Sequence, residues 1–181
     1  MQYFSTSNNK NNSDSDNLTH VDSEGHARMV GVGNKSDTRR VALASGKIIL
    51  GEAAFKLVQE NNIKKGDVLS VAQIAGIMGA KQTSSLIPLC HPLNLDNVEV
   101  KLSMEDTDLS IRVEAMVEVT GKTGVEMEAL TSVSVTLLTV YDMCKAVTKD
   151  MVITDIKLRL KTGGKSDYTQ PEWSPGHRDQ V

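Results

Sequence analysis

GKTGVEMEALTSVSVTLLTVYDMCKAVTK, residues 121–149, contains an apolar run long enough for a central helix. Its body, residues 130–147, spreads apolar side chains around most of the helical wheel, a pattern typical of a helix buried on most sides. Near its end, Asp142, Lys145 and Lys149 follow at spacings that place them on one face. An ordinary surface ion pair explains these charges. The alternative explanation of these charges is a carboxylate and an amine at the edge of a desolvated site, where the pKa values of both groups can be tuned.

The segments on either side of this helix predict β-strands. Two runs upstream of it alternate apolar and polar residues with period two and are joined by a polar turn, which predicts an antiparallel hairpin. A first strand is expected earlier in the chain, with an irregularity at Ser45-Gly46, and a last strand after the helix. The predicted strands cover residues 39–50, 98–104, 109–119 and 156–160.

Two further helices are expected between the first strand and the hairpin. One covers residues 52–59, and the other begins with Ser70 as its cap and carries an apolar stripe of Val71, Ile74, Ala75 and Met78. The order strand, helices, strand, strand, helix, strand is that of the split βαβ, ferredoxin-like α+β fold, with helices on one face of an antiparallel sheet. The polar sheet face and the apolar central helix suggest self-association.

Length and composition predict one folded domain with a polar segment at each end. Residues 1–19 are dominated by Asn, Ser and Asp and predict a disordered arm without a secretory signal, residues 20–166 a catalytic domain, and residues 167–181 a flexible tail. No apolar run approaches the length of a membrane span. Two cysteines, Cys90 and Cys144, fit a reducing cytoplasm rather than a disulfide scaffold. A net charge of -3 and few aromatic residues in the body argue against a nucleic-acid partner.

His91 is the sharpest single candidate for chemistry. Pro88 and Pro92 bracket it in a rigid loop, and histidine titrates near neutral pH, although a hydrogen-bonded loop histidine is the plainer alternative. Cys90 is a weak nucleophile candidate, because neighbours in an extended loop point opposite ways and His91 is badly placed to activate it. The two residues supply only two ligands, so no metal site is expected.

Further candidates flank the central helix. KTGGKS, residues 161–166, lacks the first glycine of a phosphate-binding P-loop, because Arg159 stands there, yet its glycines can form a backbone nest for an anion or simply a flexible strand end. Thr123 and Glu126 fit the Thr-x-x-Glu pattern of a capping box, which predicts a structural role for Glu126, whereas Glu128 has no such explanation.

These candidates together describe a pocket for a polyphosphate with a proton-transfer centre. Each is weak alone. The set consists of Arg40, Lys65, His91, Asp142, Lys145, Lys161 and Lys165.

Four blocks of sequence resemble the cyclic pyranopterin monophosphate synthase family (MoaC family) of molybdenum cofactor biosynthesis. They are PLCHPL at 88–93, KTGVEMEALT at 122–131, YDMCKAV at 141–147 and the KTGGKS loop. The resemblance implies a ferredoxin-like subunit in a hexamer, a trimer of dimers, with the site at a subunit interface. It implies a lyase that converts a cyclised GTP derivative, 3′,8-cyclo-7,8-dihydroguanosine triphosphate, to cyclic pyranopterin monophosphate and diphosphate.

The resemblance also implies roles for individual residues. Catalysis falls to Lys65, His91, Asp142 and Lys145, which we expect to converge on one cavity, with a neighbouring subunit contributing where needed. Substrate-binding residues are Leu89, Cys90, His91, Glu126, Met127, Glu128, Arg40, Lys161 and Lys165, with Lys35 and Lys165 the weaker matches to the family's phosphate-binding residues.

Two departures from the family pattern occur, Gly31 in place of an aspartate and Asp167 in place of a glycine after the KTGGKS loop. We expect no protein-bound cofactor or metal, and the residues leave open whether Mg²⁺ accompanies the triphosphate. The amine pKa values of Lys65 and Lys145 are expected to be lowered by mutual repulsion and burial. The alternatives are a non-catalytic oligomer that binds GTP-like nucleotides and a Schiff-base lyase acting through Lys145.

Overall fold

The computed structural model describes residues 26–171. Gly31 begins the compact unit that contains every helix and strand given below. The preceding unit, Met1–Val30, is described only from residue 26. The expected arm at residues 1–19 and the end of the expected tail, residues 172–181, lie outside the described residues.

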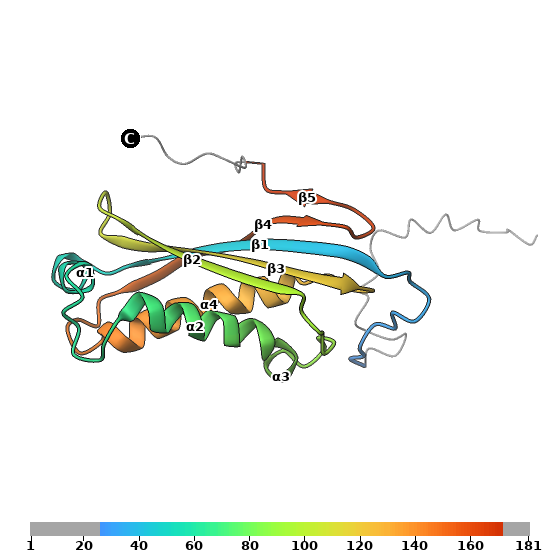
Figure 1. Cartoon of the computed structure of the whole chain (residues 1–181), viewed down its shortest axis with the longest axis horizontal. Helices are drawn as coiled ribbons and strands as arrows, with labels where there is room; N and C mark the ends of the chain where they lie inside the picture. The colour runs from blue at the N-terminus through green and yellow to red at the C-terminus, as the bar shows by residue number, and fades with distance from the viewer. Residues whose placement is uncertain (1–25, 172–181) are drawn as a thin grey trace, which may run out of the picture. The chain divides into compact units, whose positions relative to one another are not determined.

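One antiparallel sheet forms the framework of this unit (Figure 1). Its strand order is β2-β3-β1-β4-β5, and every neighbouring pair runs antiparallel. The strand order and the helices between the strands confirm the ferredoxin-like α+β prediction. The strands are β1 (Thr38–Ile49), β2 (Asn97–Glu105), β3 (Ser110–Gly121), β4 (Val152–Thr162) and β5 (Tyr168–Thr169).

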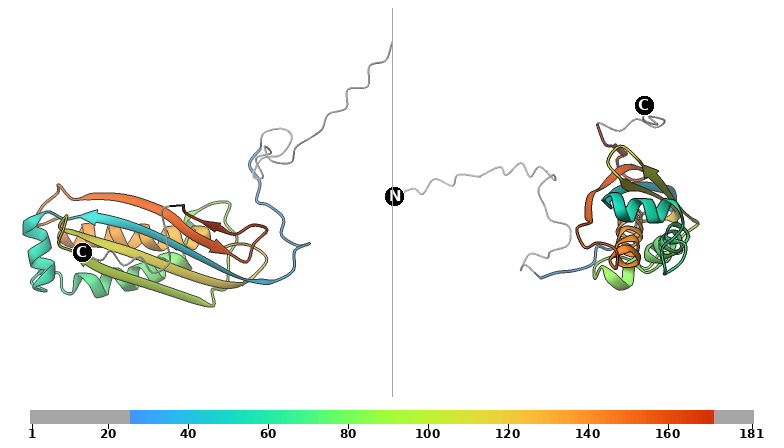
Figure 2. Two further views of the ribbon diagram at one scale, coloured as in Figure 1. Left: turned by 90° about the horizontal axis from the view of Figure 1, so that it is seen from above. Right: turned by 90° about the vertical axis from the view of Figure 1, so that its left-hand side faces the viewer.

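Two long helices cover one face of the sheet, as the views of Figures 1 and 2 show. The core lies between the layers, where Ala44 and Ile48 of β1 and Val133 and Leu137 of α4 are fully buried. The expected irregularity at Ser45-Gly46 is confirmed, since the pairing of β1 with β4 shifts register there. The helices are α1 (Glu52–Gln59), α2 (Val68–Lys81), the short α3 (Thr83–Leu86) and α4 (Glu126–Cys144).

The starts of α2 and α4 differ from the sequence-based expectation. Asp67, not Ser70, caps α2: its carboxylate accepts a hydrogen bond from the Ser70 amide at 3.0 Å. The capping box expected for Thr123 and Glu126 is wrong, because α4 starts at Glu126 and its N-cap residue, Val125, makes no side-chain hydrogen bond to the helix. The Glu126 carboxylate is therefore not used to cap the backbone amides at the start of α4.

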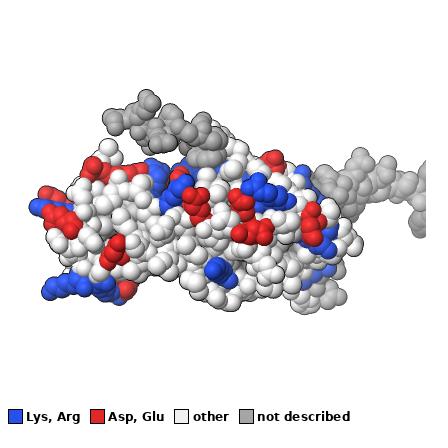
Figure 3. Space-filling view, in the orientation of Figure 1, with Lys and Arg blue, Asp and Glu red and all other residues white. Residues whose placement is uncertain are grey.

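The apolar stripe of α2 faces outward. Val71, Ile74 and Met78 are 44%, 62% and 48% exposed. The helix instead packs against α4 through small residues such as Gly76 and Gly79, which allow the two helices to approach closely. Figure 3 shows few charged side chains over α2, so this part of the surface is unusually apolar for a free chain.

The expected flexible tail does not begin at residue 167. Residues 168–169 form β5 and pair with β4, and the Gln170 amide donates to the Arg159 carbonyl at 2.8 Å. Within residues 26–171, every helix is too short or too polar to span a lipid bilayer.

Candidate functional site

The C-terminal end of α4 carries a cluster of three charged groups, Lys65, Asp142 and Lys145. The Asp142 carboxylate accepts from Lys65 Nζ at 2.7 Å and lies 2.6 Å from Lys145 Nζ. Lys65 also donates to the Asp142 carbonyl at 2.8 Å. Lys65 comes from the turn between α1 and α2. Tertiary folding therefore brings it to Asp142 and Lys145, which lie 77 and 80 positions later in the chain. The spatial association of these three residues agrees with expectation, and their catalytic role stays a prediction.

The electrostatics of this charged cluster correct one expectation. Hydrogen bonds from Lys145 and Lys65 lower the pKa of Asp142 to about 2. The hydrogen bond between Lys145 and Asp142 also raises the pKa of the Lys145 amine, whereas a lowered pKa was expected. The reason is that the amine lies at the surface beside a carboxylate, and neither burial nor repulsion outweighs that partner.

An apolar cavity of about 290 Å³ adjoins Lys65. Its lining includes Leu57, Ile63, Met143 and Val147. Sequence reasoning missed these residues, because isolated apolar positions at helix ends carry no signal of a cavity. It also missed a hydrogen bond from the Tyr141 hydroxyl to the Lys149 carbonyl, at 3.0 Å, which ties the segment after Lys145 back to α4.

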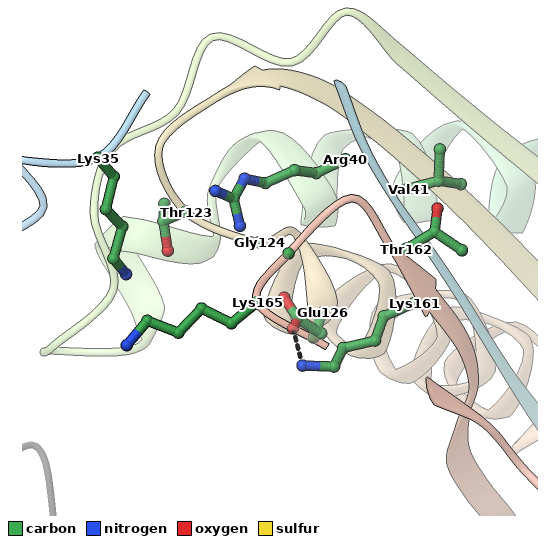
Figure 4. A pocket seen from close by; sticks show the side chains of 10 residues that line it. Lys35, Arg40, Val41, Thr123, Gly124, Glu126, Lys161, Thr162 and Lys165 are labelled. Atoms are coloured by element: carbon green, nitrogen blue, oxygen red, sulfur yellow. Dashed lines mark ion pairs between the residues drawn. The ribbon is translucent and has the colours of Figure 1, made fainter. Parts of the chain in front are cut away.

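A second cavity, of about 240 Å³, lies at the other end of α4; we call it the cationic pocket. Figure 4 shows cationic side chains gathered from the lead-in to β1, from β1 itself and from the end of β4. Arg40 is held there by a hydrogen bond from Nε to the Gly121 carbonyl, at 2.9 Å. The residues expected to bind the triphosphate thus share one cavity. Its polar lining includes Lys35, Arg40, Thr123, Glu126, Lys161 and Lys165.

The loop after β4 does not offer all of its amides to a ligand. The Gly163 amide donates to the Asp167 carboxylate at 3.0 Å, and the Gly163 carbonyl accepts from Thr38 Oγ1 at 2.8 Å. The expected backbone nest is therefore occupied at Gly163 by the chain's own carboxylate. Asp167, one of the two departures from the family pattern, closes the loop, and side chains rather than this amide are left to bind an anion.

Glu128, in the first turn of α4 at the same end, is buried, with 4% of its surface exposed. Burial raises its pKa to about 7. Burial also raises the pKa of the Cys90 thiol, with the negative charge of Glu128 as the second cause, so the loop of Cys90 and His91 neighbours this end of the helix. A raised thiol pKa disfavours Cys90 as a nucleophile. Met127 is 38% exposed beside them.

The two groups of residues lie at opposite ends of α4 (Figure 1). At 1.5 Å per residue, the backbones of Glu126 and Asp142 are about 24 Å apart. The loop of His91, which follows α3, lies toward the end of α4 that begins with Glu126 (Figure 1), and the charge of Glu128 acts on Cys90 of this loop. One chain therefore does not bring Lys65, His91, Asp142 and Lys145 into one cavity, and only their convergence between two copies stays a prediction.

Residues 29–164 match the sequence model of the MoaC family. The chain belongs to the MoaC family. The match includes the first three blocks on which the resemblance was based and the start of the fourth. Family membership, expected from those blocks, is confirmed.

Relatives of this MoaC-family chain come from animals, plants and bacteria. It is 57% identical over 151 residues to "Molybdenum cofactor biosynthesis protein 1" of Homo sapiens, covering 83% of this chain and 24% of that protein. It is 55% identical over 153 residues to "Cyclic pyranopterin monophosphate synthase" of Heliobacterium modesticaldum, covering 84% and 96%. The mitochondrial protein of that name from Arabidopsis thaliana is 58% identical over 154 residues, covering 85% and 57%. The chain thus spans about a quarter of the human relative and nearly all of the bacterial one.

Proposed function

We propose that this chain is a cyclic pyranopterin monophosphate synthase, an enzyme of molybdenum cofactor biosynthesis. It converts 3′,8-cyclo-7,8-dihydroguanosine triphosphate to cyclic pyranopterin monophosphate with release of diphosphate, as a lyase. The observation that carries the proposal is the cationic pocket, whose cations a MoaC-family chain gathers from three separate segments. The scheme uses no protein-bound cofactor.

The cationic pocket binds the triphosphate in this scheme. Lys35, Arg40, Lys161 and Lys165 face one cavity, so their charges oppose the negative charge that builds on the departing diphosphate. Its volume of about 240 Å³ is small for a whole nucleotide, which leaves the cyclised base outside it. Glu128 and the loop of Leu89, Cys90 and His91 border this end of α4 and bind the base.

Proton transfer falls to Lys65, Asp142, Lys145 and His91. Asp142 raises the pKa of Lys145, so this amine is protonated at neutral pH, and we assign it the role of proton donor to the bound substrate. Asp142 stays ionised and orients both lysines. A charged amine is a poor nucleophile, so the same contact weighs against the Schiff-base alternative.

The complete site requires two copies of the chain. The charged cluster of one copy meets the cationic pocket and the His91 loop of another, because the two lie about 24 Å apart within a single chain. The outward apolar stripe of α2, Val71, Ile74 and Met78, supports self-association. The assembly that the family resemblance implies is a hexamer, a trimer of dimers.

Diphosphate release by the purified protein supplied with the cyclised substrate tests this function. The variant Lys145→Ala should turn over about 10²–10⁴-fold more slowly, the usual contribution of an acid–base group, with triphosphate binding largely retained. Lys149→Ala is the matched control, because Lys149 lies in the same segment and makes no ion pair within residues 26–171. Its rate should equal that of the wild-type protein.

The competing function, a nucleotide-binding oligomer without catalysis, needs the cations but neither Asp142 nor His91. Substrate binding without any diphosphate release by the wild-type protein would favour it. A Lys145→Ala variant with wild-type turnover would remove Lys145 from the mechanism while leaving the synthase reaction in place.

A further inference from the structure

Among the described residues that line the cationic pocket, Glu126 is the one acidic residue. Its Oε1 lies 3.5 Å from Lys161 Nζ, the ion pair drawn as a dashed line in Figure 4. The side chain folds back over Gly124, where an added Cβ would lie 1.9 Å from Glu126 Oε2. The carboxylate therefore fills space that any other residue at position 124 would claim.

A bound phosphate would compete with this carboxylate. Both are anions, and both are attracted to Lys161, while Lys35 and Lys165 have no ion-pair partner among residues 26–171. The contact of Glu126 with Lys161 is almost an ångström longer than that of Asp142 with Lys145, 2.6 Å. The two side chains are also about one-third exposed, so water screens their attraction and the pair is easily broken.

The carboxylate has room to move away from Lys161. Glu126 and Lys161 also line an adjoining, more open cavity of about 510 Å³, bordered by Lys157, Tyr168 and Gln170. Glu126 is the first residue of α4 and caps nothing there, so rotation of its side chain leaves the helix intact. Lys157, whose amine lies 3.8 Å from the Asp155 carboxylate, supplies a cation on the side to which the Glu126 carboxylate would turn.

We infer that Glu126 is a displaceable counter-ion of the cationic pocket, which lowers the affinity for polyphosphate and speeds the release of diphosphate. The inference rests on the proposed function for the identity of the polyphosphate. In the free protein, Glu126 partly neutralises Lys161. The entering triphosphate displaces it, and its return competes with diphosphate for Lys161 once the product has formed.

Calorimetric titration of inorganic diphosphate into the full-length protein tests this role without turnover. Glu126→Gln removes the charge and keeps the shape, and it should bind diphosphate about tenfold more tightly, the effect of removing a like charge close to the ligand. Gly124→Ala keeps the charge but places a methyl group where the carboxylate lies, so it should also bind more tightly. The double variant should gain no more than either single change, because both remove one interaction.

Glu99→Gln is the matched control, since Glu99 forms a comparable surface ion pair with Lys101, at 2.9 Å on β2. Its diphosphate affinity should be unchanged. Glu126→Gln and Gly124→Ala variants that are folded and bind diphosphate no more tightly than the wild-type protein would overturn the inference. Tighter binding by both variants supports the counter-ion role of Glu126. If the wild-type protein also lacks synthase activity, only the proposed reaction is refuted.

Discussion

Two carboxylates on one helix have opposite titration behaviour because their surroundings differ. Asp142 is exposed between two amines, which lower its pKa to about 2, so it stays ionised throughout the neutral range. Glu128 is buried, with no cationic partner among residues 26–171, and its pKa rises to about 7. Glu128 therefore exchanges its proton near neutral pH, where a carboxyl can act both as donor and as acceptor of hydrogen bonds, as its proposed contact with the base requires.

The titration of Glu128 makes the stability of the chain depend on pH. Because the folded pKa is raised, folding favours the protonated form, and stability falls as pH rises from the unfolded value of 4.5 to about 7. Glu128→Gln removes this loss. The difference in free energy of unfolding, variant minus wild type, should therefore rise by at most about 3 kcal/mol between pH 4.5 and pH 8.

Urea denaturation at several pH values measures this difference for Glu128→Gln. Near pH 4.5 the wild-type side chain is protonated, so the comparison there reports only the amide substitution itself. A difference that stays constant across the range would contradict the assignment of the raised pKa to Glu128.

At the scale of elements, the contact between α2 and α4 determines where the apolar surface lies. Gly76 and Gly79 face α4, and a Cβ at Gly76 would lie 2.1 Å from Thr136 Oγ1. Two helices that meet through glycine come close together with their small faces inward. The larger apolar residues of α2, Ile74 among them, are consequently left on the outside.

Gly76→Ala should destabilise the protein by about 1–3 kcal/mol, the usual cost of overpacking. Ala is intrinsically better than Gly inside a helix by about 1 kcal/mol, so propensity alone predicts the opposite sign. The steric cause is tested by Gly76→Ala combined with Thr136→Ala, which removes the obstructing hydroxyl. Urea denaturation should show the pair to be less destabilised than the sum of its single changes, and simple additivity would refute the clash.

At the scale of the whole molecule, the length of α4 separates the two halves of the site. The helix holds Glu126 beside the cationic pocket and Asp142 beside Lys65, about 24 Å away. A rigid helix keeps this separation in every copy. Under the proposed function, assembly of copies, rather than a conformational change within one, would unite the two halves.

Mixing two inactive variants tests this shared site. Lys145→Ala disables the charged cluster and Arg40→Ala combined with Lys161→Ala disables the cationic pocket, so each homo-oligomer should be inactive. Co-expression of the two should restore about one quarter of the wild-type activity, because random mixing places two intact halves together in about one site of four. Mixed oligomers without activity would place the whole site within one chain.

Local chemistry makes much of this protein readable from its sequence. Alternation with period two predicted the hairpin of β2 and β3, and the continuous apolar character of residues 130–147 predicted the buried α4, since each pattern depends on neighbours along the chain. The order of these elements predicted the ferredoxin-like sheet. Four short motifs sufficed to predict the family.

Tertiary structure alone decided how the candidate residues group. The sequence placed Asp142 and Lys145 one turn apart, but the distance of Lys65 from them depends on the packing of α2 against α4. The sequence pattern paired Glu126 with Thr123, but the fold pairs Glu126 with Lys161 because β4 ends beside the start of α4. The position of this strand end also decides that Asp167 accepts a hydrogen bond from the Gly163 amide. Electrostatic environment is a property of neighbours in space, and residues far apart in sequence become neighbours only through folding.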